Sequence, residues 1–188
     1  MLVKDIMQRD VVTVTPDTRF FQVLRLLQPR GFRHVPVADN ETLVGIISDR
    51  DIKQAMVSLA GAGAVGAELE RARERLTASE IMGRTVITIG PMDTVEEAAR
   101  VMATQKISAL PVTEGGRLVR IVTETDVLAL FVRAMGVLEP SSRLDVTLPD
   151  TEAELGDVAH AVETAGAGMV SIMTLHGPDV GREVVLRV

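Results

Sequence analysis

The pattern of apolar and polar positions predicts mixed α and β elements, placed in the same order twice along the chain. Each copy begins with a short extended run, at residues 11–14 and 86–89. A stretch with apolar residues at helical spacing follows, then two β-rich runs joined by a polar turn, and then a second helix. In the first copy the β-rich runs are residues 35–37 and 43–47. The pattern therefore favours one supersecondary unit used twice.

Local signals predict where the first helix of each copy begins or ends. In the first copy the apolar stripe that starts at Phe20 is expected to stop at Pro29, which has no amide hydrogen to donate. In the second copy Asp93 and Glu96 have the spacing of a capping box. Between the copies, residues 68–76 carry a thin apolar stripe among charged side chains, which predicts a bridging helix.

The two copies align without a gap at an offset of 75 residues. Between residues 5 and 51, 13 of the 47 aligned pairs are identical, and many others are close chemical matches such as Asp5 with Glu80. Positions 75 apart are therefore expected to do equivalent work. A hypothesis about a site in one copy becomes two hypotheses that must agree.

The last part of the chain lies outside the repeat and predicts a small α+β unit. Residues 143–148 are expected to form a strand, and residues 155–166 a helix. Two further strands are expected at residues 169–175 and 183–188, around a turn at 177–179. The predicted divisions of the chain are a first repeat, a linker with its bridging helix, a second repeat and the tail, at residues 1–57, 58–78, 79–138 and 143–188.

Composition and charge exclude several classes of function. The chain has no cysteine, so disulfides, thiolate metal sites and cysteine nucleophiles are excluded. A net charge of −6 and the lack of Trp and Tyr argue against a nucleic-acid partner. A charged N-terminus and the lack of a long apolar run favour a cytoplasmic protein without a membrane partner. Because His34, His160 and His176 fit no catalytic or metal-binding motif, we expect neither an enzyme nor a metal site.

A hydroxyl followed three residues later by a carboxylate recurs between a strand and a helix. The pairs are Ser48 with Asp51 and Thr123 with Asp126. One interpretation is structural, because a hydroxyl at the N-cap and an acidic residue at N3 stabilise a helix start. The other is functional: the carboxylate accepts hydrogen bonds from a ribose, and the helix N-terminus faces a phosphate. Both interpretations can hold together.

These residues also carry a resemblance to a known family. Four elements of the first copy recur in the same order in the second copy, where the last of them ends with Thr123 to Asp126. In the first copy they are Asp5-Ile6-Met7, Thr13-Val14-Thr15-Pro16, His34-Val35-Pro36-Val37 and Gly45 to Asp51. Over about residues 1–136 the chain resembles a tandem pair of CBS domains, also called a Bateman module. The resemblance implies an α+β, pseudo-twofold pair whose two clefts bind AMP, ADP, ATP or S-adenosylmethionine, with no required cofactor, and which forms a homodimer.

The tail resembles the first part of an ACT domain, a ferredoxin-like βαββ unit. Residues 148–155 resemble its strand-to-helix turn and residues 168–172 its second strand, but Ala153 replaces the turn glycine that usually approaches an amino-acid ligand. A dimerisation role is therefore at least as well supported as ligand sensing. With this tail, the chain resembles CBS–ACT proteins of the acetoin-utilisation type.

The resemblance implies site residues at matching positions, each with an alternative. The two hydroxyl–carboxylate pairs match the ribose-binding pair. The adenine walls, which could also be plain core, are Val11, Val12, Val35 and Pro36 for one cleft and Val86, Ile87, Leu110 and Pro111 for the other. Grouped by repeat, the residues expected to supply phosphate contacts are Arg33, His34 and Arg50, with Arg30, around the first cleft, and Lys106 and Arg120 around the second. This grouping predicts that phosphate prefers the first cleft.

The leading hypothesis is a non-catalytic, energy-sensing regulatory module. Binding of an adenosine-containing nucleotide would shift the angle between the repeats and signal to an unidentified effector protein, provided that the ligand prefers one angle. The alternative is a ligand-free, CBS-like dimerisation scaffold that acts by protein contact alone. Nucleotide affinity that depends on Asp51 and Asp126 distinguishes the two.

Overall fold

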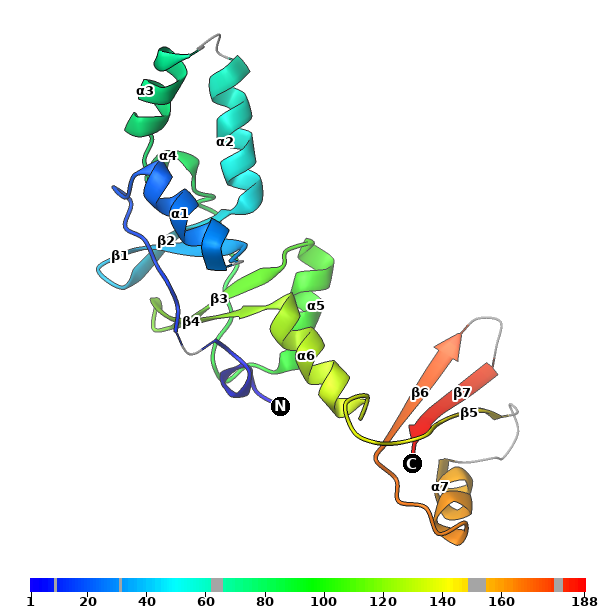
Figure 1. Ribbon diagram of the computed structural model, residues 1–188. Coiled ribbons are helices and arrows are strands. Elements are labelled where there is room, and N and C mark those ends of the chain that lie inside the picture. The colour runs from blue at the N-terminus through cyan, green and yellow to red at the C-terminus, as the bar shows by residue number, and fades with distance from the viewer. Residues whose placement is uncertain (9, 31, 62–65, 149–154, 178–180) are drawn as a thin grey trace. The chain divides into compact units, whose positions relative to one another are not determined.

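The computed structural model describes residues 1–188 apart from 9, 31, 62–65, 149–154 and 178–180. It divides into two compact units, Met1–Val127 and Leu128–Val188, with the division inside helix α6. The elements appear in Figure 1 in this order: η1 (Val3–Asp5), α1 (Phe20–Arg30), β1 (His34–Asp39), β2 (Thr42–Ser48), α2 (Asp49–Gly61), α3 (Ala67–Arg75), α4 (Ala78–Ile81), α5 (Val95–Gln105), β3 (Ala109–Glu114), β4 (Arg117–Thr123), α6 (Glu124–Ala134), β5 (Arg143–Leu148), α7 (Leu155–Thr164), β6 (Ser171–Gly177) and β7 (Gly181–Arg187).

The first unit is built on one four-stranded sheet with the strand order β1-β2-β4-β3. Each repeat supplies one antiparallel hairpin, and the two hairpins have the same register: His34 pairs with Ser48 and Ala109 pairs with Thr123, at the offset of 75. Both hairpins also have a register shift at the same place, after Val37 and after Val112. The sequence repeat is therefore reproduced residue by residue in the sheet.

The hairpin turns require left-handed backbone conformations. In the first hairpin Asn40 and Glu41 have φ values of 46° and 69°, and in the second Gly115 and Gly116 have φ values of 57° and 82°. Two-residue turns of this kind match the right-handed twist of the strands, and they favour Asn and Gly because both tolerate positive φ. The sequence predicted a polar turn at residues 38–41, which the structure narrows to its last two residues.

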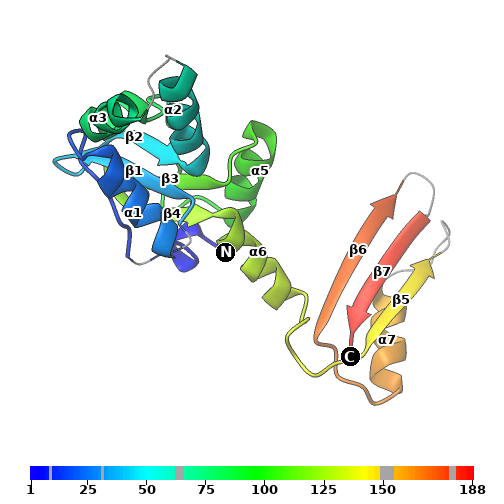
Figure 2. The same cartoon turned by 45° about the horizontal axis from the view of Figure 1, so that its top comes forward.

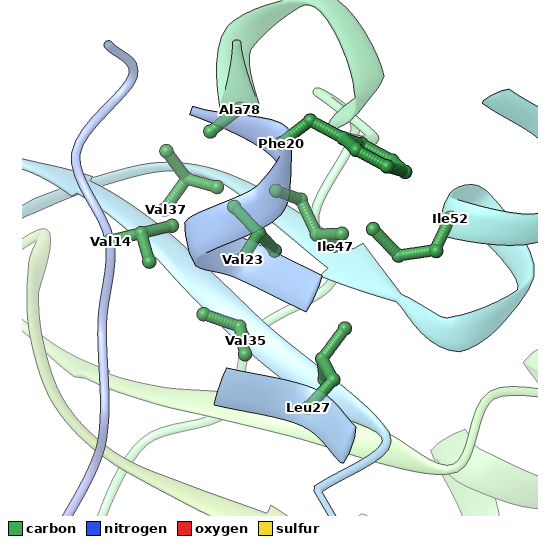
Figure 3. Close-up of a cluster of buried hydrophobic side chains, with 9 residues drawn as sticks. All are labelled: Val14, Phe20, Val23, Leu27, Val35, Val37, Ile47, Ile52 and Ala78. Atoms are coloured by element: carbon green, nitrogen blue, oxygen red, sulfur yellow. The ribbon is translucent and has the colours of Figure 1, made fainter. Parts of the chain in front are cut away.

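The first repeat has its own hydrophobic core, in which α1 and α2 pack on the strands. Figure 3 shows the side chains of this cluster, with Phe20 and Val23 of α1 facing Val35 of β1 and Ile47 of β2. Phe20 is fully buried and its ring meets that of Phe21 edge-on at 5.7 Å. The apolar stripe read from the sequence is therefore the buried face of α1. The full cluster is Val14, Phe20, Val23, Leu27, Val35, Val37, Ile47, Ile52 and Ala78.

Two local predictions are wrong in detail, whereas the two extended runs are present and each joins β1 or β3 through one parallel bridge, at Val14 and at Ile89. The cap of α5 is Thr94, whose hydroxyl accepts from the Glu97 amide at 3.2 Å, while Asp93 accepts from the Gly90 amide. Helix α1 continues past Pro29 and ends one residue later, at Arg30.

The second unit contains a three-stranded antiparallel sheet in the order β5-β7-β6. Helix α7 covers one face of these strands (Figure 2) and packs Val158 and Val162 against Leu148, Val184 and Leu186. The predicted order of strand, helix, strand, strand is confirmed. The segment 149–154, with Ala153, and residues 178 and 179 of the predicted 177–179 turn lie outside the described residues.

Candidate functional site

Both hydroxyl–carboxylate pairs form the predicted capping box. Asp51 Oδ2 accepts the Ser48 backbone amide and the Ser48 hydroxyl, both at 2.7 Å, where β2 passes into α2. At the start of α6, Asp126 Oδ2 accepts the Thr123 amide at 2.8 Å and the Thr123 hydroxyl at 2.6 Å. One oxygen of each carboxylate therefore holds the helix start. The other oxygen, Oδ1, is the one that this capping box leaves uncommitted.

One cleft contains the pair Thr123 and Asp126 and is called the Asp126 cleft. Its volume is about 240 Å³. Thr123 and Asp126 face the apolar residues Val11 and Val12 across it. The full lining is Gln8, Asp10, Val11, Val12, Phe32, Arg33, His34, Pro36, Ser108, Ile121, Thr123, Thr125 and Asp126.

The other cleft contains the pair Ser48 and Asp51 and is called the Asp51 cleft. Its volume is about 300 Å³. Ser48 and Asp51 meet Val86 and Ile87 here. Both clefts are near the lower end of small-molecule sites, roughly 300–1,000 Å³. The full lining is His34, Ile46, Ser48, Asp49, Arg50, Asp51, Gly83, Thr85, Val86, Ile87, Lys106, Ile107, Ser108, Ala109 and Pro111.

Each cleft is thus assembled from both repeats, and this corrects the grouping by repeat. The two hairpins meet edge to edge through β2 and β4, and the segment before each repeat's first helix reaches the other repeat's strand. Gln8 bridges to Ile121, and Gly83 bridges to Ile46, as the offset of 75 requires. The carboxylate of one repeat therefore shares a cleft with the apolar wall of the other.

The exchange places the charged residues differently from the sequence expectation. Arg50 lies in the Asp51 cleft with Lys106, whereas Arg33 lies in the Asp126 cleft. The expectation that Arg33 and Arg50 surround the same cleft is therefore wrong. Among the residues that the structure describes, one guanidinium stands against two carboxylates in the Asp126 cleft, whereas the Asp51 cleft has two cations and two carboxylates.

Three residues expected at the site lie elsewhere. The side chains of Val35 and Leu110 are completely buried, and Val35 belongs to the core of Figure 3. Both side chains therefore belong to the hydrophobic core, which was the alternative interpretation for these residues. Arg120 donates to the Val119 carbonyl at 2.8 Å and lines neither cleft. Its counterpart Gly45 lies so close to Met82 that an added Cβ would come within 2.4 Å of the sulfur.

A shared wall separates the two clefts. His34 and Ser108 line both, with the His34 Nε2 and the Ser108 hydroxyl oxygen 3.4 Å apart. Burial and, to a lesser extent, Arg33 lower the pKa of His34, while Asp49, Asp51 and Glu124 act in the opposite direction. A neutral ring is therefore favoured near neutral pH. A phosphate in either cleft would oppose this shift by stabilising the charged ring.

Sequence reasoning missed several lining residues, chiefly Gln8, Asp10, Gly83 and Ser108. Gln8 and Gly83 directly follow the repeated Ile-Met pair. The repeat could therefore have shown that the two positions are equivalent, but not that each lies against a strand of the other repeat. Among the described residues, no group of three or more His, Asp or Glu side chains is placed to hold a metal ion. None of the helices in the described ranges is long and apolar enough to cross a membrane.

Comparison with known families agrees with the geometry. The CBS domain model matches twice, at residues 3–58 and 78–133, which is more than half of the chain. The chain belongs to the CBS-domain family. The tandem pair expected from the sequence is therefore confirmed, whereas this model does not extend to the tail.

Relatives of different sizes share this CBS pair. The CBS domain-containing protein DDB_G0289609 of Dictyostelium discoideum is 33% identical over 144 residues, which is 76% of this chain and 99% of that protein. The chain spans only about half of the protein MJ1225 of Methanocaldococcus jannaschii, which is 36% identical over 135 residues (69% of this chain and 47% of the relative). Some relatives are enzymes: an inosine-5'-monophosphate dehydrogenase of Korarchaeum cryptofilum is 37% identical over 139 residues, 73% of this chain but 26% of the enzyme.

Three solved structures are similar to the CBS pair. A Vibrio cholerae protein named for acetoin utilization (AcuB) has a TM-score of 0.63 at 27% identity, covering 76% of this chain and 98% of its own. The CBS domain pair of MJ0100, solved with 5'-methylthioadenosine and S-adenosyl-L-methionine, has a TM-score of 0.57 at 32% identity, covering 70% and 95%. CBSX2, solved with AMP, has a TM-score of 0.59 at 26% identity, covering 70% and 96%.

Proposed function

We propose that this chain is a non-catalytic regulatory module that binds adenosine-containing nucleotides in the Asp126 and Asp51 clefts. The observation that carries the proposal is the same combination in both clefts. Each has an apolar wall from one repeat, a hydroxyl–carboxylate pair at a helix start from the other, and at least one cation. Solved relatives of this fold hold AMP, or 5'-methylthioadenosine and S-adenosyl-L-methionine.

Each part of a nucleotide has a chemical counterpart in this arrangement. The branched side chains of Val11 and Val12, or of Val86 and Ile87, offer apolar surface to a planar base. The carboxylate of Asp51 or Asp126 accepts hydrogen bonds from ribose hydroxyls. Phosphate contacts are assigned to Arg33 and His34 in the Asp126 cleft, and to Arg50, Lys106 and the same His34 in the Asp51 cleft.

Calorimetric titration with AMP, ADP, ATP and S-adenosylmethionine tests the proposal, because the chain has no Trp or Tyr to report binding by fluorescence. The diagnostic variants are Asp51→Asn and Asp126→Asn. An amide oxygen can still accept from the Ser48 or Thr123 amide, so the helix cap is largely kept, while the second carboxylate oxygen is replaced by a donor. We expect each variant to lose roughly ten- to a hundredfold in affinity at its own cleft, the scale of a hydrogen bond to a charged group.

A folded, nucleotide-free protein that binds none of the four ligands would overturn the proposal and favour the ligand-free scaffold. Binding that survives both Asn substitutions would also contradict it, because the ribose role of the carboxylates would then be wrong. Circular dichroism of each variant separates lost binding from lost folding. In the sensor, the bound ligand alters the relation between the two repeats and so the surface offered to an effector protein.

We further propose that residues 143–188 form a partial ACT-like unit that associates with a second copy of the chain. Support comes from its ferredoxin-like strand order and from an apolar groove of about 420 Å³ beside α7, lined by Leu144, Val146 and Val188 among others. Strand β5 lies at the sheet edge, and Arg143 and Asp145 flank Leu144 on it. Antiparallel pairing about Leu144 would set Arg143 of each copy opposite Asp145 of the other.

The oligomeric state tests this assignment. Leu144 is 43% exposed, so Leu144→Arg is expected to convert a dimer to monomer without unfolding the unit. Leu138→Arg, at a residue that is 69% exposed and outside the groove, is the matched control. Light scattering after size-exclusion chromatography measures both. A wild-type monomer, or a dimer that Leu144→Arg leaves intact, would contradict this association.

A further inference from the structure

The Asp126 cleft contains an internal hydrogen bond that its counterpart does not repeat. In addition to the capping bonds on Oδ2, Asp126 accepts at Oδ1 a hydrogen bond from the side-chain amide of Gln8. Both residues line the cleft. Both oxygens of the carboxylate assigned to the ribose are therefore already engaged by the chain itself.

The equivalent place in the Asp51 cleft has no side chain. Gly83 is the residue 75 positions after Gln8, and it lines the Asp51 cleft together with Asp51. The backbone at the two positions is held alike: the Gln8 amide donates to the Ile121 carbonyl at 3.0 Å, and the Gly83 amide donates to the Ile46 carbonyl at 2.9 Å. The two clefts therefore differ here in one side chain, with the same strand contact beneath it.

We infer that Gln8 acts as an internal competitor for the Asp126 carboxylate, so that the two clefts fill in order, the Asp51 cleft first. This inference rests on the proposed nucleotide-binding function. A ribose that enters the Asp126 cleft competes with the Gln8 amide for the acceptor sites of Oδ1, whereas a ribose in the Asp51 cleft meets a carboxylate without a competing side chain from the equivalent position. Because the chain itself already occupies one of these acceptor sites, affinity in the Asp126 cleft is reduced.

The charges act in the same direction. Arg33, the guanidinium described in the lining of the Asp126 cleft, also lies 4.0 Å from the Glu124 carboxylate, which competes with a ligand phosphate for it. Thr125 occupies the position equivalent to Arg50, so the Asp126 cleft lacks the cation that the Asp51 cleft has next to its carboxylate. Arg50, the cation at that position, favours a phosphate-bearing ligand in the Asp51 cleft.

The repeat allows a reciprocal exchange of the competing side chain. Gln8→Ala removes the amide from the Asp126 cleft. Gly83→Gln adds one to the Asp51 cleft, and the site accepts a Cβ, because its nearest neighbour would be the Ile46 carbonyl oxygen at an ordinary 3.7 Å. The measurement is calorimetric titration with AMP of the wild type and of both variants. Asp51→Asn and Asp126→Asn identify which binding step belongs to which cleft.

The wild type is expected to show two unequal steps, the tighter one removed by Asp51→Asn. Gln8→Ala should tighten the weaker step by roughly three- to tenfold, the scale of one exposed hydrogen bond to a charged group, and Gly83→Gln should weaken the tighter step by a similar factor. The inference is overturned if Gln8→Ala weakens or does not change the Asp126 step, since Gln8 would then assist the ligand or do nothing. It is equally overturned if the tighter step belongs to Asp126.

A readout without ligand separates this inference from the proposed function. The side-chain amide resonances of Gln8 should shift in Asp126→Asn and stay in place in Asp51→Asn, because only the first removes its acceptor. If the resonances shift but AMP does not bind, the hydrogen bond between Gln8 and Asp126 exists, while both the competition with a ligand and the proposed function are overturned. Two AMP steps with unmoved resonances would retain the function and overturn the role of Gln8.

Discussion

The imidazole of His34 and the hydroxyl of Ser108 lie 3.4 Å apart and line both clefts at once. The two residues are not equivalent under the repeat, since His34 corresponds to Ala109 and Ser108 corresponds to Arg33. The wall between the clefts therefore has one titratable group, contributed by the first repeat. Events in either cleft act on the same imidazole ring.

The first prediction concerns pH. The pKa of His34 is lowered in the folded state by burial and by Arg33, against the opposing charges of Asp49, Asp51 and Glu124. The unfolded chain therefore binds more protons between this lowered pKa and the usual value of about 6.5. The free energy of unfolding should fall as the pH drops through that window, and it should be fully retained above it.

Denaturant unfolding at several pH values measures this dependence. His34→Gln is expected to flatten it over the window, and His160→Gln, at an exposed position, controls for the loss of a histidine elsewhere. Stability that rises on acidification in the wild type, or an unchanged slope in His34→Gln, would contradict the assignment.

The second prediction concerns the helix cap at the start of α6. Thr123→Ala removes the hydroxyl that donates to Asp126 and that accepts from its amide at 3.4 Å. A loss of about 1 kcal/mol in the free energy of unfolding is expected, the usual scale for an N-cap. Thr123→Ser keeps the hydroxyl and should keep most of the stability. Equal losses in the two variants would mean that the methyl group, not the cap, matters here.

The third prediction concerns the close approach at Gly45. A Cβ there would lie 2.4 Å from the sulfur and 3.1 Å from the Cβ of Met82, so the whole side chain has to move. We expect Gly45→Ala to destabilise the first unit by about 1–3 kcal/mol, the usual cost of overpacking. Adding Met82→Ala should recover part of that loss, which a double-mutant cycle would measure. Gly156→Ala, where none of the described residues lies within 4 Å of the added carbon, is the control that should show no loss.

The fourth prediction separates core from cleft. Leu110 was a candidate for an adenine wall, but its side chain is completely buried. Leu110→Ala should therefore cost about 2–5 kcal/mol, as for other large-to-small core substitutions. Leu138→Ala, at a residue that is 69% exposed, should cost little. A stable Leu110→Ala protein with weakened AMP binding would instead assign this residue to the cleft.

Much of the fold follows from local pattern. The stripe containing Phe20 and Val23 gave helix α1 and its buried face, and the tail pattern gave the order of β5, α7, β6 and β7. Errors occur at element ends, where signals one residue apart compete. Thr94 rather than Asp93 caps α5, because Asp93 holds the Gly90 amide instead. The extended runs are shorter contacts than the hairpins, since each meets its neighbouring strand at one bridge.

The sequence by itself determined that two equivalent units exist, which positions correspond, and that a hydroxyl and a carboxylate stand at the start of a helix in each. These properties are local or are carried by the offset of 75. Only the tertiary structure decided which residues share a cleft. Pairing of β2 with β4 brings Asp51 to Val86 and Asp126 to Val11, and it places Arg33 and Arg50, which were expected together, in different clefts. A repeat reveals which residues are alike, whereas contact between the copies depends on long-range strand pairing that no local pattern encodes.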